Sequence, residues 1–296
     1  MYHKMLVLLD GSKLAEVVFT YAQELSARLN INLELLHVCS PQEAEQLPMR
    51  QAYMEKMAEI LQSKAAEIRA NIGDKTPADE VKAVGKVVIG YPAEEILKYA
   101  DENKIDLIML STHGRSGTKA WDLGNVANKV IHASRFPIWL VPTELREEII
   151  YDKLPKRTMV IPLDGSRQAE AIIPHAINIA KQRGADSEII LVQVDNPMKA
   201  VFTADQIKQQ QEDRLEGEIY LQSIVKRFGE EGIKARAQML LGEPAPTIID
   251  FVKNNPAQLI AMATHGHASL SRMIFGSTTE NILQLVKKTP IFLVKP

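Results

Sequence analysis

The chain has 296 residues, which at roughly 150 residues per domain predicts about two domains. With 46% hydrophobic and 24% charged residues, its composition excludes a disordered, collagenous or low-complexity chain. Lys and Arg number 35 against 37 Asp and Glu, a net charge of −2, so the whole-chain charge argues against non-specific binding of nucleic acid.

The single cysteine and the amino terminus narrow the class of protein further. Cys39 has no cysteine partner in the chain, which excludes an intramolecular disulfide and a cysteine-based zinc cage. The amino-terminal apolar run covers only residues 5–9 before Asp10 interrupts it. A signal peptide needs an apolar stretch of about 7–15 residues and a membrane span about 20. We therefore expect a cytoplasmic protein without a membrane segment.

The chain repeats itself, because five landmarks recur in the same order at offsets of 152 to 154 residues. Residues 9–12 (Leu-Asp-Gly-Ser) recur at 163–166, 90–92 (Gly-x-Pro) at 242–244, 112–114 (Thr-His-Gly) at 264–266, Gly124 at Gly276, and 137–141 at 290–294. We predict two copies of one domain, at residues 1–144 and 156–296, joined by a linker at 145–155.

In chain order, each copy alternates short apolar runs with amphipathic segments, a pattern typical of a parallel sheet covered by helices. In the first copy the predicted strands are 4–9, 32–39, 81–89, 106–111 and 137–141, and the predicted helices are 12–29, 48–70, 92–102 and 119–133. The second copy repeats the strands at 158–163, 188–194, 234–241, 259–263 and 290–294. Five strands with right-handed crossovers predict a doubly wound, five-stranded parallel α/β domain, repeated once.

Two segments of each copy lie where such a sheet binds ligands, beyond the carboxyl ends of its strands. Asp10 and Asp164 end the first strand of their copies, and the fourth strand runs into a glycine-bearing loop. In the second copy, Gly276 to Thr279 open the last helix, where free amides and the hydroxyls of Ser277, Thr278 and Thr279 would suit phosphate oxygens. The chain contains neither the Walker pattern nor G-x-G-x-x-G, which excludes the two best-known phosphate loops.

The same residues have plainer interpretations. A glycine between a strand and a helix often only turns the chain, and Ser277 can serve as a helix cap alone. Asp10 and Asp164 can cap the helices that follow them, which does not prevent them from holding a ribose hydroxyl or a magnesium ion. His113 and His265 have no Ser, Cys or acidic partner at a spacing defined by a motif, so turn histidines are favoured and no catalytic residue is assigned.

These features together resemble the universal stress protein family: the strand followed by Asp-Gly-Ser, the Gly-x-Pro before a helix, the Thr-His-Gly, and a glycine ten residues later. The resemblance covers both copies, so it implies a tandem-type member with Rossmann-like, adenine nucleotide alpha hydrolase-like domains. Nucleotide-binding members of the family carry G-x-x-G, nine residues, then G-[ST]. The second copy departs from that pattern only at Ala263, whereas the first departs at Ser111 and Asn125.

The resemblance implies bound ATP, with Mg²⁺ as an optional companion, and favours the second copy. There adenine would lie near Pro162, Leu163 and Val194, Asp164 would lie by the ribose and phosphates, and the loop would contact the phosphates through Gly266, Gly276, Ser277 and Thr278. The corresponding positions of the first copy are Leu9, Asp10, Val38, Ser111, Gly114, Gly124, Asn125 and Val126. Asn125 can still donate through its amide, so nucleotide binding in the first copy stays open.

The function implied by the resemblance is that of an ATP-binding regulator of the stress response. Two rival functions are a slow ATPase, with His265 or Asp164 as the water-positioning base, and an interaction module that binds no nucleotide. The last strands, at 136–141 and 289–294, are apolar, and the resemblance implies that they join copy to copy, so that one chain imitates a dimer of single domains. Whether two chains then form a homodimer is left open.

Overall fold

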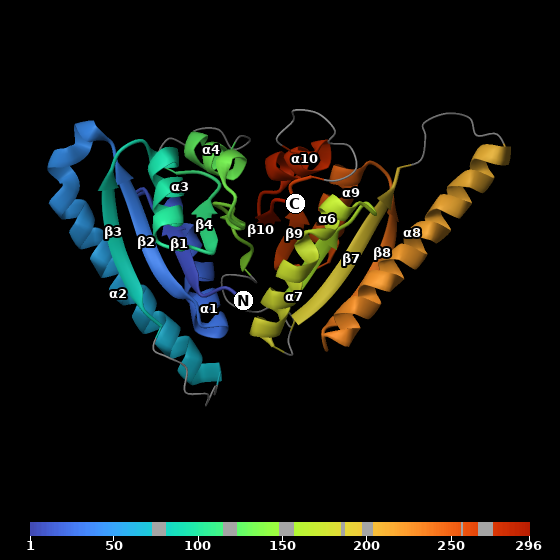
Figure 1. Cartoon of the computed structure of the whole chain (residues 1–296), viewed down its shortest axis with the longest axis horizontal. Helices are drawn as coiled ribbons and strands as arrows, with labels where there is room; N and C mark the ends of the chain where they lie inside the picture. Colours follow the sequence, from blue (N-terminus) through green and yellow to red (C-terminus); the bar gives the residue numbers. More distant parts are fainter. Residues whose placement is uncertain are drawn as a thin grey trace. The chain divides into compact units, whose positions relative to one another are not determined.

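The computed structural model describes residues 1–72, 81–114, 123–147, 157–184, 187–196, 204–255, 257–265 and 275–296. The chain divides into two compact units, Met1–Ile150 and Tyr151–Pro296 (Figure 1). Most of the predicted linker, from 148 to 155, lies outside the described residues. Within the described residues each unit is an α/β domain with a wholly parallel sheet, so the predicted fold class is confirmed.

The first unit follows the predicted alternation of strands and helices. Its strands are β1 (Lys4–Leu8), β2 (Asn32–Cys39), β3 (Ala83–Ile89), β4 (Leu107–Ser111) and β5 (Ile138–Val141). Its helices are α1 (Phe19–Leu29), α2 (Leu47–Ile72), α3 (Pro92–Glu102) and α4 (Asn125–Ala133), with short 3-10 turns at Ala15–Val18 and Pro41–Gln46.

The second unit repeats this order. Its strands are β6 (Arg157–Pro162), β7 (Ser187–Asp195), β8 (Lys234–Leu241), β9 (Leu259–Ala263) and β10 (Ile291–Val294). Its helices are α6 (Arg167–Glu170), α7 (Ile172–Arg183), α8 (Ala204–Glu230), α9 (Pro244–Asn254) and α10 (Ser277–Leu285).

The strand order reverses once in each sheet, between its first and fourth strands. In the first unit the strands lie in the order β3-β2-β1-β4-β5, and in the second in the order β8-β7-β6-β9-β10. The first strand of each unit therefore has the second strand on one side and the fourth on the other. This reversal opens a crevice at the carboxyl ends of these strands, which is where open α/β sheets bind ligands.

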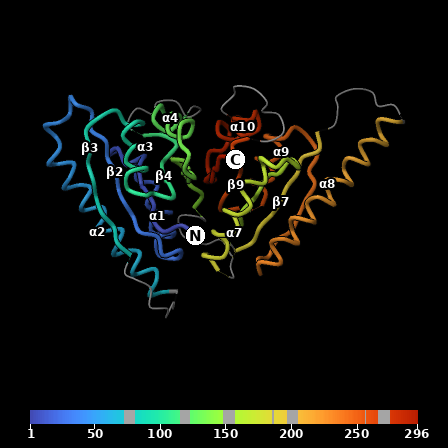
Figure 2. The backbone as a smooth tube through the Cα atoms, viewed as in Figure 1, coloured from blue at the N-terminus to red at the C-terminus, as the bar shows by residue number. Residues whose placement is uncertain are grey.

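Helices on both faces bury the strands. In the first unit α1 packs on α2, and α3 packs on α4, so that two helical layers enclose the sheet (Figures 1 and 2). Every residue of β4 and β5 is buried, as the nearly continuous apolar runs predict. Trp139 of β5 is fully buried and its ring centroid lies 5.7 Å from that of Tyr21 on α1. These contacts attach the last strand of the sheet to the helical layer.

The helix predicted at 12–29 begins later than expected. Residues Ala15–Val18 form a 3-10 turn and the α-helix begins at Phe19. The Asp-Gly-Ser turn ahead of it, with a left-handed φ of 77° at Gly11, is followed by a further turn at residues 13–14 before the 3-10 turn begins. The helix predicted at 119–133 is described from Asn125, with Gly124 as its extended N-cap, while 119–122 lie outside the described residues. No helix in the described ranges has the length and apolar character needed to cross a membrane.

Candidate functional site

A left-handed glycine turn follows the first strand of each unit. Gly11 and Gly165 have φ values of 77° and 82°, a conformation that side chains with a Cβ rarely adopt. The turn folds the chain back on the preceding aspartate: Asp10 Oδ1 accepts a hydrogen bond from the Ser12 amide at 2.9 Å, and Asp164 Oδ1 accepts one from the Ser166 amide at 3.0 Å. Each carboxylate is thus fixed at the switch point of its sheet.

In the second unit Ser166, rather than Asp164, is the N-cap of the helix that follows, whereas in the first unit Ser12 only stabilises the turn ahead of the 3-10 turn, whose N-cap is Leu14. Ser166 Oγ accepts the Ala169 amide at 3.0 Å, and Ser12 Oγ accepts the Ala15 amide at 3.2 Å. Ser166 Oγ also donates to Asp164 Oδ1 at 2.6 Å. The hypothesis that the aspartates are themselves the caps is therefore wrong: they orient the turn that follows, and Asp164 stays exposed to solvent.

The amino terminus of α10 closes the crevice of the second unit from above β9. The Gly276 amide donates to the Thr264 carbonyl at 3.0 Å, and the first intrahelical bond runs from the Glu280 amide to the Gly276 carbonyl at 3.0 Å. The amides of Ser277, Thr278 and Thr279 come before that first bond and have no acceptor within the helix. The expectation that the Gly276 amide is also free is wrong, because it ties the helix to the turn after β9.

The hydroxyls at this helix terminus differ in where they point. Thr279 Oγ1 is buried and donates to the Ala263 carbonyl at 3.4 Å, a long bond that attaches α10 to the end of β9. The expectation that the Thr279 hydroxyl is a phosphate donor is therefore wrong. Ser277 and Thr278 line the crevice and are exposed and half-buried, respectively. The donors that this end of α10 offers are three amides and these two hydroxyls.

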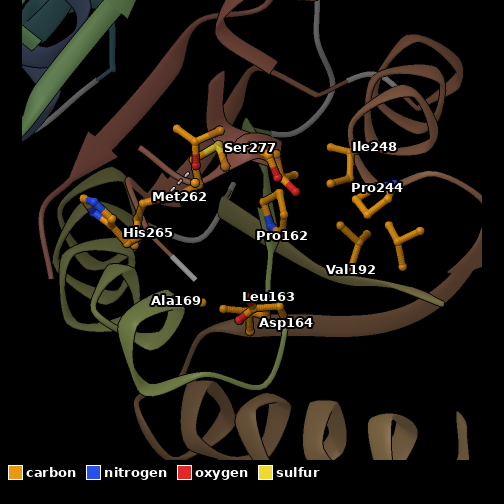
Figure 3. Close-up of a pocket in the computed structure, with 15 residues that line it drawn as sticks. Pro162, Leu163, Asp164, Ala169, Val192, Pro244, Ile248, Met262, His265 and Ser277 are labelled. Atoms are coloured by element: carbon orange, nitrogen blue, oxygen red, sulfur yellow. Dashed lines mark hydrogen bonds between the residues drawn. The ribbon is translucent and has the colours of Figure 1, made fainter. Parts of the chain in front are cut away.

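The second cavity, as we call this crevice of the second unit, holds about 690 Å³ including the space that opens to solvent. Its apolar residues Pro162, Val192, Pro244 and Ile248 lie together on one side and His265 lies on the other (Figure 3). The residues lining it are Pro162, Leu163, Asp164, Ala169, Val192, Val194, Pro244, Ile248, Met262, Ala263, His265, Gly276, Ser277, Thr278 and Thr279. An apolar wall facing a few convergent donors is the usual build of a small-molecule site.

The first cavity is the equivalent crevice of the first unit and also holds about 690 Å³. It is lined by Leu8, Leu9, Asp10, Ala15, Leu36, Val38, Pro92, Ile96, Leu110, Ser111, Thr112, His113, Gly114, Gly124, Asn125, Val126 and Ala127. Its helix terminus repeats the backbone closure of the second unit, because the Gly124 amide donates to the Thr112 carbonyl at 2.9 Å.

Two glycines of the first cavity lie close to their neighbours, and at Gly114 an added Cβ would force the neighbouring side chain to move. A Cβ on Gly114 would lie 2.1 Å from Asp10 Oδ2, and a Cβ on Gly124 would lie 3.3 Å from the Thr112 carbonyl oxygen. The Asp10 carboxylate therefore lies directly against the turn that follows β4. Ser111 Oγ donates to the His113 carbonyl at 2.6 Å and holds the same turn in place.

The two histidines are built into these turns. His113 Nδ1 lies 3.0 Å from Thr112 Oγ1, and His265 Nδ1 lies 2.9 Å from Thr264 Oγ1. The other ring nitrogen of His113, Nε2, is buried. This geometry suits turn histidines better than a general base, which needs a nitrogen aimed at its substrate. Within the described ranges no three His, Cys, Asp or Glu side chains gather in a way that could hold a metal ion.

In each unit a tyrosine of the longest helix lies near a glutamate: Tyr53 of α2 near Glu16, and Tyr220 of α8 near Glu170. Tyr53 Oη donates to Glu16 Oε1 at 2.7 Å, and burial together with this hydrogen bond raises the pKa of Tyr53. In the second unit, burial and the charge of Glu170 raise the pKa of Tyr220. The charge of the site aspartate adds to the rise in both units. The raised pKa keeps both phenols protonated well above neutral pH.

The structure brings the predicted site residues of each copy together around one cavity, except Gly266, which lies outside the described residues. Their roles as nucleotide contacts stay predictions. Sequence reasoning missed the wall made by α9, where Pro244 and Ile248 lie, and its counterpart on α3, where Pro92 and Ile96 lie. The repeated Gly-x-Pro was the available signal, since it begins both helices directly at the crevice.

Comparison with known proteins gives one consistent family. The model of the "Universal stress protein family" matches residues 1–142 and again 156–295. "Universal stress protein MJ0531" of Methanocaldococcus jannaschii is 33% identical over 142 residues, which cover 47% of this chain and 82% of that protein. "Universal stress protein Rv2005c" of Mycobacterium tuberculosis is 22% identical over 299 residues, covering 99% of this chain and 97% of that protein.

Solved structures agree on the fold. A universal stress protein from Archaeoglobus fulgidus superposes with a TM-score of 0.65 at 21% identity, covering 99% of this chain and 98% of that one. A protein from Pseudomonas aeruginosa, PA1789, superposes with a TM-score of 0.67 at 15% identity over 100% of this chain and 93% of that one. At sequence identities this low, the structural similarity shows the fold alone.

Proposed function

This chain belongs to the universal stress protein family as a tandem of two domains, and from that premise we propose that it is a regulator that binds ATP, chiefly in its second domain. The observation that carries the proposal is the second cavity. In it an apolar wall, the Asp164 carboxylate and the amino terminus of α10 converge on a space of about 690 Å³. An apolar wall facing a few convergent polar groups is the usual arrangement of a small-molecule site.

The chemistry of this cavity suits the parts of an adenine nucleotide. Pro162, Val192 and Ile248 offer apolar surface against which a flat base can pack. The amides of Ser277, Thr278 and Thr279 carry the partial positive charge of a helix amino terminus, which favours phosphate. Asp164 is exposed and fixed by the Ser166 amide, which places its carboxylate where it can accept a ribose hydroxyl or meet a magnesium ion.

Loss of the side-chain hydroxyls at α10 tests the proposal. Hydrogen bonds to charged groups contribute about 1.5–3 kcal/mol, so Ser277→Ala and Thr278→Val should each weaken ATP binding by about ten-fold or more. Isothermal titration calorimetry with ATP and magnesium measures the affinity. Ser223→Ala is the matched control, because Ser223 lies on the exposed side of α8 and bonds only to a backbone carbonyl of its own helix.

Measurements of ATP binding and of phosphate release also test the two rival functions. Failure of the unmodified chain to bind ATP at millimolar concentration would reject the proposal in favour of an interaction module without nucleotide. Release of phosphate above the buffer background, abolished by Asp164→Ala, would instead support a slow ATPase. The bond between His265 and Thr264 favours binding over hydrolysis, because it assigns the histidine to the turn.

A further inference from the structure

The long helix α8 of the second unit is packed against its sheet over only part of its length. Its 27 residues run from Ala204 to Glu230. From 205 to 216 every residue except Gln210 is exposed, and in Figure 1 this end of the helix diverges from β8. Most helical stability in proteins comes from burying one face of the helix. Among the residues that the structure describes, the amino-terminal half of α8 buries almost nothing.

Two large apolar side chains point outward from α8. Leu215 is 58% exposed and Ile219 is 62% exposed. Because they are four residues apart they share one face, which lies opposite to the face that packs on the sheet. The buried residues of that packed face are Gly217, Leu221, Ile224 and Phe228. The core of the second unit therefore uses neither of the two outward side chains.

The matching helix of the first unit, α2, has no large apolar side chain at the same positions. The buried residues of α2 are spaced like those of α8, which aligns the two helices. They are Met54, Ala58, Leu61 and Ala65. In this alignment Leu215 corresponds to Ala52 and Ile219 to Lys56, both of which are exposed. Ala and Lys are ordinary residues for a solvated helix face. The apolar pair is therefore a property of α8 and not of the repeated domain.

Charged residues extend this outward face in both directions. Ahead of the apolar pair, Lys208 Nζ lies 3.8 Å from Glu212 Oε1. Behind it, Lys226 Nζ lies 4.0 Å from Glu230 Oε1. All four charged side chains are exposed, and they continue the face of the apolar pair at helical spacing. In both ion pairs the lysine comes first.

This order of charges is complementary to itself when the helix is turned end to end. Lys208 and Glu230 lie equally far from Ile219 along the helix, and Glu212 and Lys226 do so as well. A second α8 lying antiparallel, with the two-fold axis at Ile219, therefore places each lysine opposite a glutamate of its partner. A parallel pair in register would instead set like charges against each other. Complementary charges of this kind fix the orientation and register of paired helices.

We propose that two copies of this chain associate through α8, as an antiparallel helix pair centred on Ile219. The partner covers Leu215 and Ile219, and the lysine–glutamate pairs on both sides set the register. Each copy contributes the same surface, so the interface closes as a dimer and does not propagate into a fibre. The inference is independent of the proposed function, since it involves neither cavity.

Exchanging the apolar pair for the residues of α2 tests whether this face carries the association. Sedimentation velocity of the whole chain should show the mass rising from 33.1 kDa toward twice that value at about 100 μM protein. Leu215→Ala combined with Ile219→Lys should keep the chain monomeric, and both new residues are good helix formers. Glu67→Lys is the matched control, because it reverses one charge of an exposed ion pair on α2 and should leave the association unchanged.

Reversal of single charges tests the antiparallel register. Glu212→Lys alone sets lysine against Lys226 of the partner subunit, and Lys226→Glu alone sets glutamate against Glu212 of the partner subunit. Each variant should associate about ten-fold more weakly than the unmodified chain. In an equimolar mixture of the two variants every facing pair is again a lysine and a glutamate. The mixture should therefore associate about as tightly as the unmodified chain.

Three results would overturn the inference: a monomer at about 100 μM, association undiminished by Leu215→Ala with Ile219→Lys, or a mixture of the charge variants that associates no more tightly than either variant alone. Circular dichroism shows whether the double variant keeps its helices. If it does not, the charge variants decide the question, because they retain both apolar residues.

Discussion

Replacing Gly114 with alanine perturbs the closest approach in the first cavity. The added Cβ would lie 2.1 Å from Asp10 Oδ2, a distance that packed atoms do not reach. Asp10 is held by the Ser12 amide at 2.9 Å, so the carboxylate must rotate and weaken that bond. Hydrogen bonds to charged groups contribute about 1.5–3 kcal/mol, and because Asp10 is only half-buried we expect the free energy of unfolding of this unit to fall by about 1–2 kcal/mol.

The distribution of tryptophan makes this loss measurable in one unit of the chain. Both tryptophans of the sequence, Trp121 and Trp139, belong to the first unit, so tryptophan fluorescence follows its unfolding alone. In a Trp121→Phe background the reporter is Trp139, which is fully buried. Urea unfolding of this background with and without Gly114→Ala gives the change in unfolding free energy. The dependence of that free energy on urea concentration should be the same for both proteins.

A double-mutant cycle decides whether the carboxylate is the cause. In an Asp10→Ala background the atom that clashes is gone, so Gly114→Ala should cost less than about 0.5 kcal/mol, and the two substitutions should couple strongly. An equal cost in the presence and absence of Asp10 would refute the reasoning, since the strain would then lie in the backbone of the turn.

Three other predictions concern the scaffold around the cavities. Gly85→Ala should lower the free energy of unfolding by about 3 kcal/mol, because its Cβ would lie 2.3 Å from a backbone carbon of α2, whereas Gly229→Ala, with no neighbouring atom within 4 Å, should be neutral or stabilising in the same urea experiment. Because burial and the Glu16 hydrogen bond raise the pKa of Tyr53, stability should fall above about pH 10, and Tyr53→Phe should flatten that fall in tryptophan-fluorescence unfolding measured from pH 9 to 11. Ser166→Ala should cost about 1 kcal/mol through loss of the helix cap, and an unchanged melting curve by circular dichroism would contradict that role.

The sheets could be predicted because their signal is local. Apolar runs such as 107–111 and 138–141 are buried on both faces, so the sequence itself carries the pattern, and the helices after Gly90 and Gly242 begin at Pro92 and Pro244 as proline at a first turn predicts. The helix predicted at 12–29 begins too early, because helical periodicity does not distinguish a 3-10 turn from the α-helix that begins at Phe19.

The site residues that could be predicted are chiefly those that stand in short, recognisable sequence segments. Asp164, Ser277 and Thr278 stand in recognisable segments, whereas Val192 and Ile248 reach the cavity from the middle of elements whose only sequence signal is apolar character. Which side of a buried strand or helix faces a crevice depends on packing between elements distant in the chain. Sequence periodicity alone cannot supply that information.

The hydrogen bond between the Gly276 amide and the Thr264 carbonyl changes how substitutions at this helix should be interpreted. Its counterpart joins Gly124 to Thr112, so both units build the crevice with the same backbone closure. A branched residue at either glycine would disturb this closure. Weaker ligand binding by such a variant could then result from a distorted backbone as well as from a lost contact. Exchanging Thr278 for valine leaves the closure intact and removes one oxygen from the cavity. A side-chain exchange of this kind therefore separates the loss of a contact from a distortion of the backbone.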